Sequence, residues 1–121
     1  MSRPMRRRFQ EKIHQQAGIR ITRIQDQIRA VDYICSGSVV RRRKLCGKPS
    51  CRCSQDPDAR HGPYYEWGFM KDGRLAHRMV SADQARLLRR AIANYRRVLR
   101  CLRAWERQTA RIVDEQIKAN R

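Results

Sequence analysis

The chain has 121 residues, of which 29 are Lys or Arg and 11 are Asp or Glu, giving a formal net charge of +18. This length fits one domain, and this charge excludes most ordinary metabolic enzymes. Apolar residues make up 40% of the chain and aromatic residues 7%, so we expect a thin core and an elongated shape. The sequence has no run of about 18 apolar residues, so we expect a cytoplasmic protein that does not span a membrane.

Residues 1–8 are rich in arginine and are predicted to form a flexible basic arm. A single domain is predicted over residues 9–121, beginning with a helix at about 9–34. Apolar residues recur there every three or four positions, which places them on one stripe of a helix. The stripe consists of Phe9, Ile13, Ala17, Ile21, Ile24, Ile28, Val31 and Cys35. Ser36, Gly37 and Ser38 are expected to end this helix.

Residues 35–81 change character and predict a small head with three short strands, near 38–45, 64–70 and 74–80. Valine and aromatic residues favour strands there, and Asp72-Gly73 is typical of a hairpin turn. The stretch between the first two strands is rich in Pro, Gly and Asp. It is therefore predicted to be a loop that needs an additional link to hold it in place.

Ser81 and Gln84 have the spacing of a capping box, and no Gly or Pro follows them, so a long helix is predicted at about 82–118. Its apolar stripe consists of Leu88, Ile92, Tyr95, Leu99, Leu102, Thr109 and Val113, widened by Ala91, Val98, Trp105 and Ile112. The predicted fold is α+β: a long antiparallel, coiled-coil-like helical hairpin with a three-stranded antiparallel sheet and a zinc-binding loop at its tip. The longer second helix could support a homodimer.

Cys46, Cys51, Cys53 and His61 follow the pattern C-x4-C-x-C-x7-H. Three thiolates and one imidazole suit a closed, tetrahedral Zn²⁺ site, and thiols in a reducing compartment favour metal binding over disulfides. The alternative is a loop with free thiols. Cys35 is a rival for the fourth ligand position. Cys101, His14 and His77 are interpreted as structural or exposed.

The segment Cys46-Gly-Lys-Pro-Ser-Cys-Arg-Cys, followed by His61-Gly-Pro-Tyr-Tyr, resembles the signature of a small, basic prokaryotic family of uncharacterised proteins. Members are often encoded near transposases and other mobile elements. The resemblance extends over about residues 35–115. It implies a mobile-element or nucleic-acid setting and no particular activity. Our own hypothesis is an accessory subunit of a mobile-element, transposase or RNA-guided nuclease system.

Arginines occupy one side of the predicted last helix, between about 60° and 200° on a helical wheel that starts at Leu88. They are Arg86, Arg89, Arg90, Arg96, Arg97, Arg100, Arg103, Arg107 and Arg111. Like charges four residues apart destabilise an isolated helix, whereas a phosphate backbone would turn this repulsion into attraction. A second basic patch around the loop consists of Arg41, Arg42, Arg43, Lys44, Lys48 and Arg52, together with Arg60. The alternative is a solvated charged face.

Tyr65, Trp67 and Phe69 would share one face of a strand, opposite Tyr64 and Glu66. We expect the first set to pack on the helices, although such rings can also stack on unpaired bases. The carboxylates are scattered and no phosphate-binding glycine loop is present, so we expect no enzymatic activity.

The sequence therefore predicts a non-catalytic, zinc-stabilised protein that binds DNA or structured RNA, mainly through the phosphates. The alternative is a protein interaction or dimerisation module that docks onto a larger enzyme. A basic amphipathic helix on anionic lipid is a weaker third hypothesis, because the apolar stripe is needed for packing within the chain.

Overall fold

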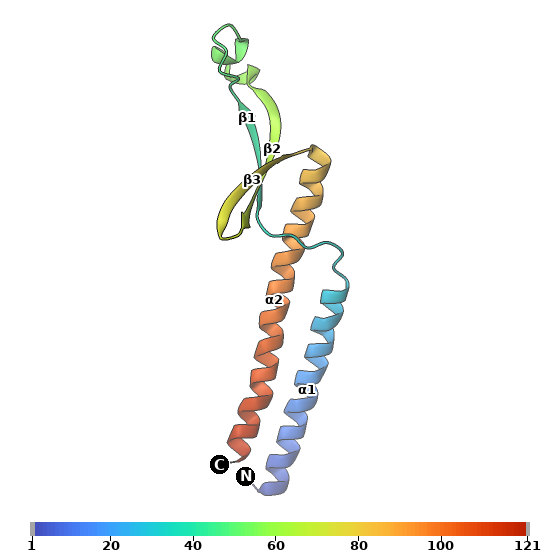
Figure 1. Ribbon diagram of the computed structural model, residues 1–121. Helices are drawn as coiled ribbons and strands as arrows, with labels where there is room; N and C mark the ends of the chain where they lie inside the picture. The colour runs from blue at the N-terminus through green and yellow to red at the C-terminus, as the bar shows by residue number, and fades with distance from the viewer. Residues whose placement is uncertain (1, 121) are drawn as a thin grey trace. The chain divides into compact units, whose positions relative to one another are not determined.

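The computed structural model describes residues 2–120, which form two helices and a three-stranded antiparallel sheet, an α+β arrangement as predicted (Figure 1). The elements are α1 (Arg3–Arg29), β1 (Ser38–Lys44), β2 (His61–Lys71), β3 (Arg74–Val80) and α2 (Ala82–Ala119). Two short 3-10 turns, η1 (Arg52–Ser54) and η2 (Pro57–Ala59), lie between β1 and β2. The chain divides into two compact units, residues 2–32 with 96–120 and residues 33–95.

The first helix begins earlier than the sequence indicated. The Met5 N–H donates to the Ser2 hydroxyl at 3.4 Å, so Ser2 acts as the N-cap. Pro4 lies in the first turn, where its missing N–H costs no helical hydrogen bond. Residues 3–8, predicted to be a flexible arm, therefore form the first turns of α1.

The same helix ends at Arg29 and not at 34. The residues that follow it in the chain bond to α2, because the Cys35 N–H donates to the Ala91 carbonyl at 3.2 Å. In addition, the Asn94 amide donates to the Tyr33 carbonyl at 3.0 Å. These bonds hold the segment after α1 in a non-helical conformation, which a helical apolar period could not reveal.

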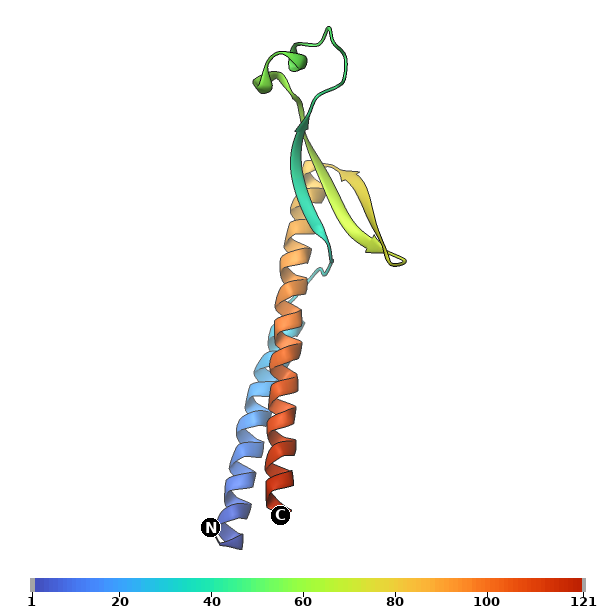
Figure 2. The ribbon, with the colours of Figure 1, turned by 90° about the vertical axis from the view of Figure 1, so that its left-hand side faces the viewer.

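In the unit of residues 2–32 and 96–120, α1 and the C-terminal part of α2 run side by side (Figures 1 and 2). Three hydrogen bonds join them: Gln10 Nε2 to the Glu115 carbonyl, Arg111 Nη2 to Gln16 Oε1, and Cys101 Sγ to Gln27 Oε1. Residue numbers fall on α2 as they rise on α1, so these helical segments are antiparallel. Ile13, Ala17 and Cys101 are the buried apolar residues of this unit.

The side of α2 that faces α1 differs from the predicted stripe. Cys101 and Arg111 bond to α1, while Leu102 and Val113 are each 44% exposed. Thr109 is exposed as well. Glutamine side chains of α1 form hydrogen bonds with α2 in this contact. Polar pairs therefore replace some of the apolar contacts that the periodicity indicated. Within residues 2–120, neither helix contains a stretch long and apolar enough to cross a membrane.

The sheet has the order β1-β2-β3, and the three strands lie where the sequence placed them, except that β2 begins at His61. Trp67 pairs with Val39 on one side and with Arg78 on the other. Asp72 and Gly73 have φ values of 52° and 77°, the left-handed pair that a tight type I′ hairpin needs. The predicted turn is thus confirmed.

One face of β2 carries the half-buried rings of Tyr65, Trp67 and Phe69, with the centroids of the last two 4.1 Å apart. The Arg89 guanidinium of α2 lies 5.7 Å from the Tyr65 ring centroid, and Trp67 lines a cavity with Leu87 and Leu88. The beginning of α2 is thereby held beside this face of the sheet.

The capping box at the start of α2 is formed as predicted. The Gln84 N–H donates to the Ser81 hydroxyl at 3.1 Å, and the Ser81 N–H donates to Gln84 Oε1 at 2.8 Å. These reciprocal bonds fix the first turn of the helix directly after β3.

Gly37 has a φ of 108°, and a methyl group on it would overlap the Gly68 carbonyl and lie 2.9 Å from Trp67 Nε1. We therefore expect Gly37→Ala to lower the free energy of unfolding by about 1–3 kcal/mol, measured by urea denaturation. Gly18 lies inside α1 with no atom near the added methyl group. Gly18→Ala, the control, should raise stability by about 0.5–1 kcal/mol. Equal stability of the Gly37→Ala variant and the wild type would contradict this assignment.

Candidate metal centre and basic surfaces

The thiols of Cys46, Cys51 and Cys53 and the imidazole of His61 meet in one cluster, with all four ligand atoms within 4.8 Å of one another. Cys46 Sγ lies 3.5 Å from Cys53 Sγ, and Cys51 Sγ lies 3.3 Å from His61 Nε2. The structure thus brings together the four predicted ligands. Figures 1 and 2 show their loop at one end of the β1–β2 ribbon, opposite the turn between β2 and β3.

Strand pairing supplies two of the four ligands. Lys44 pairs with His61 at the end of the ribbon, so Cys46, two residues beyond Lys44, starts the loop close to the imidazole. The register shifts between Arg42 and Lys44, which is a bulge beside the cluster. The ends of the loop are therefore joined by the sheet before any metal binds.

A short helical turn supplies the other two ligands. Cys51 is the residue before η1 and Cys53 lies within it, which is the tight turn that a single intervening residue requires. The Ser54 hydroxyl donates to the Cys51 carbonyl at 2.8 Å and lies 3.2 Å from the Pro49 carbonyl. The Cys51 N–H donates to the Lys48 carbonyl at 3.0 Å. These bonds hold the backbone of the turn that carries both cysteines.

The thiols of Cys51 and Cys53 differ in acidity. The pKa of Cys51 is lowered to about 6, chiefly by a hydrogen bond with the Cys53 backbone and then by the His61 imidazole. For Cys53, a hydrogen bond with the Cys46 backbone lowers the pKa. Burial and the neighbouring thiols outweigh that bond, so the net shift is upward. Cys51 is therefore converted more readily than Cys53 to the thiolate that metals bind.

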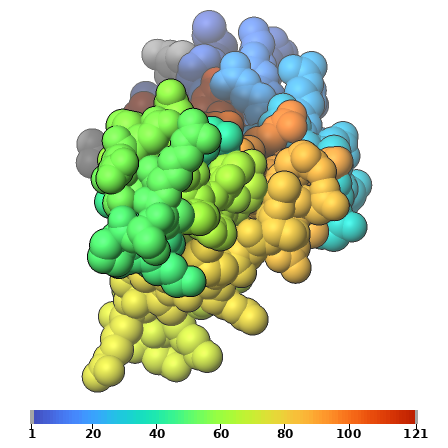
Figure 3. All heavy atoms as spheres, turned by 90° about the horizontal axis from the view of Figure 1, so that it is seen from above, coloured from blue at the N-terminus to red at the C-terminus, as the bar shows by residue number. Residues whose placement is uncertain are grey.

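The donor set fits a tetrahedral ion. Sulfurs bound to one Zn²⁺ at about 2.3 Å lie about 3.8 Å apart, close to the 3.5 Å between Cys46 and Cys53. Cys53 is buried, while Cys46 and His61 are exposed, so one side of the cluster faces solvent. In the space-filling view of Figure 3 the green loop lies on the surface that faces the viewer. The group can hold a metal ion, and its chemistry is compatible with zinc.

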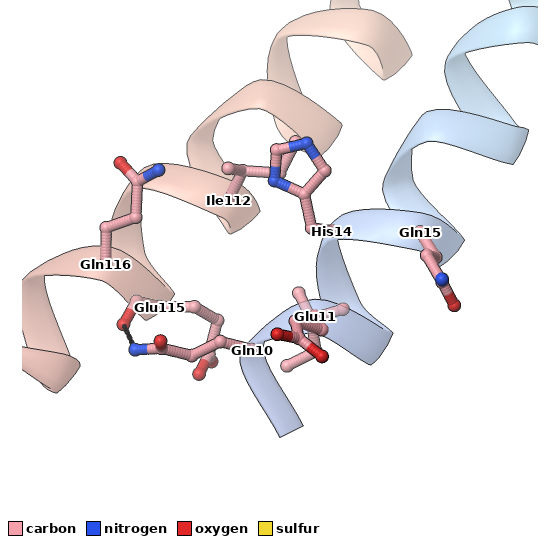
Figure 4. A pocket seen from close by; sticks show the side chains of 8 residues that line it. Gln10, Glu11, His14, Gln15, Ile112, Glu115 and Gln116 are labelled. Atoms are coloured by element: carbon pink, nitrogen blue, oxygen red, sulfur yellow. Dashed lines mark hydrogen bonds between the residues drawn. The ribbon is translucent and has the colours of Figure 1, made fainter. Parts of the chain in front are cut away.

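The other Cys and His residues lie outside this cluster. The Sγ of Cys35, the rival ligand, lies 3.5 Å from the Ser36 carbonyl oxygen. Cys101 is buried at the contact with α1. His77 Nδ1 lies 2.9 Å from Glu66 Oε1. His14 lines an open groove of about 410 Å³ between α1 and α2, together with Glu115 and other residues (Figure 4).

The basic residues around the loop have different surroundings. Arg42 lies 3.8 Å from the Glu66 carboxylate, and Arg52 lies 3.5 Å from that of Asp56. Arg43 is exposed, and its guanidinium donates to backbone carbonyls of the loop. The exposed residues for which no carboxylate partner is found within residues 2–120 are Arg41, Lys44, Lys48 and Arg60.

The arginines of α2 also divide. Arg86 pairs with Asp83, Arg89 lies over Tyr65, and Arg90 is exposed. Five exposed arginines have no carboxylate partner within residues 2–120: Arg96, Arg97, Arg100, Arg103 and Arg107. We call this set the stalk arginines. They extend over about 16 Å of helix.

Arg111, which the sequence places on the same basic face, differs from the stalk arginines in its surroundings. Its side chain is half-buried, and its Nη2 donates to Gln16 Oε1 at 3.0 Å. Position 111 lies on the side of α2 that faces α1, and a long guanidinium side chain can reach a glutamine across the contact. The sequence carried no signal for this bond, because the helical wheel places Arg111 at about 140°, well inside the arginine arc.

These features define a small α+β protein with a Cys₃His cluster beside its sheet. A family described as a domain of unknown function (DUF6788) matches residues 10–90, and the chain belongs to that family. The matched segment contains the four cluster residues and ends before Arg96, whereas the sequence resemblance was expected to extend over 35–115. No curated protein matches the chain. No solved structure matches it either.

Cobalt(II) titration tests the ligand set, because thiolate ligands give Co²⁺ an intense absorption. Cys51→Ser should abolish binding of one Co²⁺ per chain, since it removes one of four ligands. Cys35→Ser, also at a half-buried thiol, should bind Co²⁺ like the wild type. Loss of binding in Cys35→Ser with retention in Cys51→Ser would contradict the assignment.

Proposed function

We propose that this protein is a non-catalytic, zinc-stabilised nucleic-acid-binding protein that contacts the phosphates of DNA or structured RNA. Zn²⁺ would be held by Cys46, Cys51, Cys53 and His61. Three thiolates and one imidazole fill all four positions of a tetrahedral ion, which leaves none for a substrate. The metal would therefore order the loop and carry out no reaction.

The observation that carries the nucleic-acid proposal is the isolation of the stalk arginines from acidic groups. Arg96 and Arg100, like Arg103 and Arg107, are like charges four residues apart on one helix. Such pairs each cost about 0.2–0.5 kcal/mol in an isolated helix. Some exposed arginines elsewhere in the chain have a carboxylate partner, as Arg7 has Glu11, and others, such as Arg41 and Arg60, have none within residues 2–120. An unneutralised set therefore supports a polyanionic ligand.

Phosphates suit this set for two reasons. A residue four positions along a helix is displaced by about 6 Å, so neighbouring arginines can reach successive points on a nucleic-acid backbone. The planar guanidinium also donates two hydrogen bonds to one phosphate, and each neutralised phosphate releases counterions. The exposed cations near the loop, among them Arg41, Lys44 and Lys48, would offer phosphate contacts of their own.

Two finer predictions belong to this proposal. One is the hairpin layout, in which the sheet and the metal loop lie at the tip of the paired helices. The other is an accessory role in a mobile-element, transposase or RNA-guided nuclease system, which would suit the mobile-element setting that the sequence resemblance implies. Both stay predictions, and neither is needed for the binding experiment.

Replacing the five stalk arginines by Gln should weaken binding to duplex DNA and to a structured RNA. If each arginine contacts one phosphate, the slope of log K against log salt on duplex DNA should fall by up to about 4.5. Fluorescence anisotropy over a series of salt concentrations measures this slope.

The matched control removes the same charge from arginines that have carboxylate partners: Arg7, Arg29, Arg42, Arg52 and Arg86. This control variant should keep most of the affinity and slope. Failure of the wild type to bind either nucleic acid at about 100 mM salt would contradict the proposal, as would equal losses in both variants.

A second candidate function is self-association through α2, and the exposed apolar side chains at 102, 113 and 117 favour it. Leu102 and Val113 are each 44% exposed and Ile117 is 51% exposed. Trp105, Thr109 and Val113 line an open cavity on the same helix, with Glu106 and Asp114 at its margin. A second copy suits this face, because an isologous interface uses the same patch on both subunits and an exposed apolar patch can pack against its own copy.

In that case, Leu102→Glu should convert a dimer to a monomer, measured by light scattering at several protein concentrations. The control is Leu75→Glu, at a residue that is 64% exposed on β3. A wild type that stays monomeric at all concentrations would exclude self-association and leave the nucleic-acid proposal intact.

A further inference from the structure

Arg43 connects β1 to the part of the loop that leads into His61. Its Nη2 lies 2.9 Å from the Asp58 carbonyl and 3.2 Å from the Arg60 carbonyl, and it donates to both. Arg60 directly precedes His61 in the chain. The guanidinium of Arg43, on β1, therefore holds the backbone that directly precedes His61, the first residue of β2.

The segment held by Arg43 has few other links to the sheet. Within η2, Asp56 accepts from the Asp58 N–H at 2.9 Å, and the Ala59 N–H donates to the Asp56 carbonyl at 3.0 Å. Arg52 of η1 reaches the Asp56 carboxylate. These bonds fold η2 on itself and onto η1. Among the described residues, the Arg43 side chain joins this segment to β1.

The position of Arg43 in β1 suits a link between this strand and the segment before His61. The register between β1 and β2 shifts between Arg42 and Lys44, so Arg43 lies at the bulge next to the cluster. A bulge redirects a side chain relative to the regular strand. A lysine at this position would offer a point charge, whereas the planar guanidinium presents donors in a fixed fork.

We propose that Arg43 is a positioning residue of the metal centre, which places His61 against the three thiols before the ion arrives. The inference rests on the proposed metal site and deepens it. It removes Arg43 from the nucleic-acid surface to which the basic run Arg41–Lys44 was assigned. Groups that orient metal ligands from outside the coordination sphere change affinity by roughly 10–100-fold when they are replaced.

The experiment compares Arg43→Gln with Arg41→Gln, a matched change of charge two residues earlier on the same strand. Co²⁺ affinity is measured by competition with a chromophoric chelator, and folding is checked by circular dichroism. Arg43→Gln should weaken Co²⁺ binding by roughly 10–100-fold, and Arg41→Gln should leave it unchanged. Arg43→Lys, which keeps the charge and loses the fork, should restore only part of the affinity.

A double-mutant cycle separates positioning of His61 from a general loss of stability. If Arg43 acts through the imidazole, His61→Ala combined with Arg43→Gln should bind Co²⁺ as weakly as His61→Ala alone. Additive losses would overturn the proposal, as would equal affinity of Arg43→Gln and Arg41→Gln. Failure of the wild type itself to bind Co²⁺ would overturn the metal site and this inference together.

Discussion

Four ligand atoms from a loop, a short helical turn and the start of a strand approach within 4.8 Å, and the order of the loop depends on that approach. Hydrophobic burial cannot replace it there. Cys53 is the buried apolar residue of the described loop, and no large side chain within residues 2–120 is fully buried. A loop of this composition, in a chain with a net charge of +18, therefore needs a specific polar or metal link. Strand pairing between Lys44 and His61 brings the two ends of the loop together. The side chains of the loop then complete the cluster.

Internal bonding separates the arginines into two chemical groups. Some are structural: Arg43 donates to the loop backbone, Arg89 lies over a tyrosine ring and Arg111 bonds to a glutamine of α1. The stalk arginines have no carboxylate partner among the described residues and stay exposed. The proposed ligand is therefore inferred from the second group alone. Counting all arginines of the helix together, as a helical wheel does, mixes these two groups.

Local chemistry allowed several elements to be predicted from the sequence. The Asp72-Gly73 turn, the Ser81 and Gln84 capping box and the three strands depend on residues that are neighbours in the chain or on backbone preferences. The four cluster residues were recognisable for a similar reason. Their spacing and ligand chemistry are visible without knowledge of the fold. Their mutual distances then agree with one ion.

Other features depended on contacts between distant residues. α1 ends at Arg29 because the following segment bonds to α2, although the apolar period continues to Cys35. Which side of α2 meets α1 is decided by pairs such as Gln16 with Arg111, and this choice leaves Leu102 exposed. The sequence by itself determined which segments form helices and strands and which residues can bind a metal, because these follow from local propensity and ligand type. Only the tertiary structure decided the covered face of α2 and the partners of individual arginines, because long polar side chains can bond in many directions.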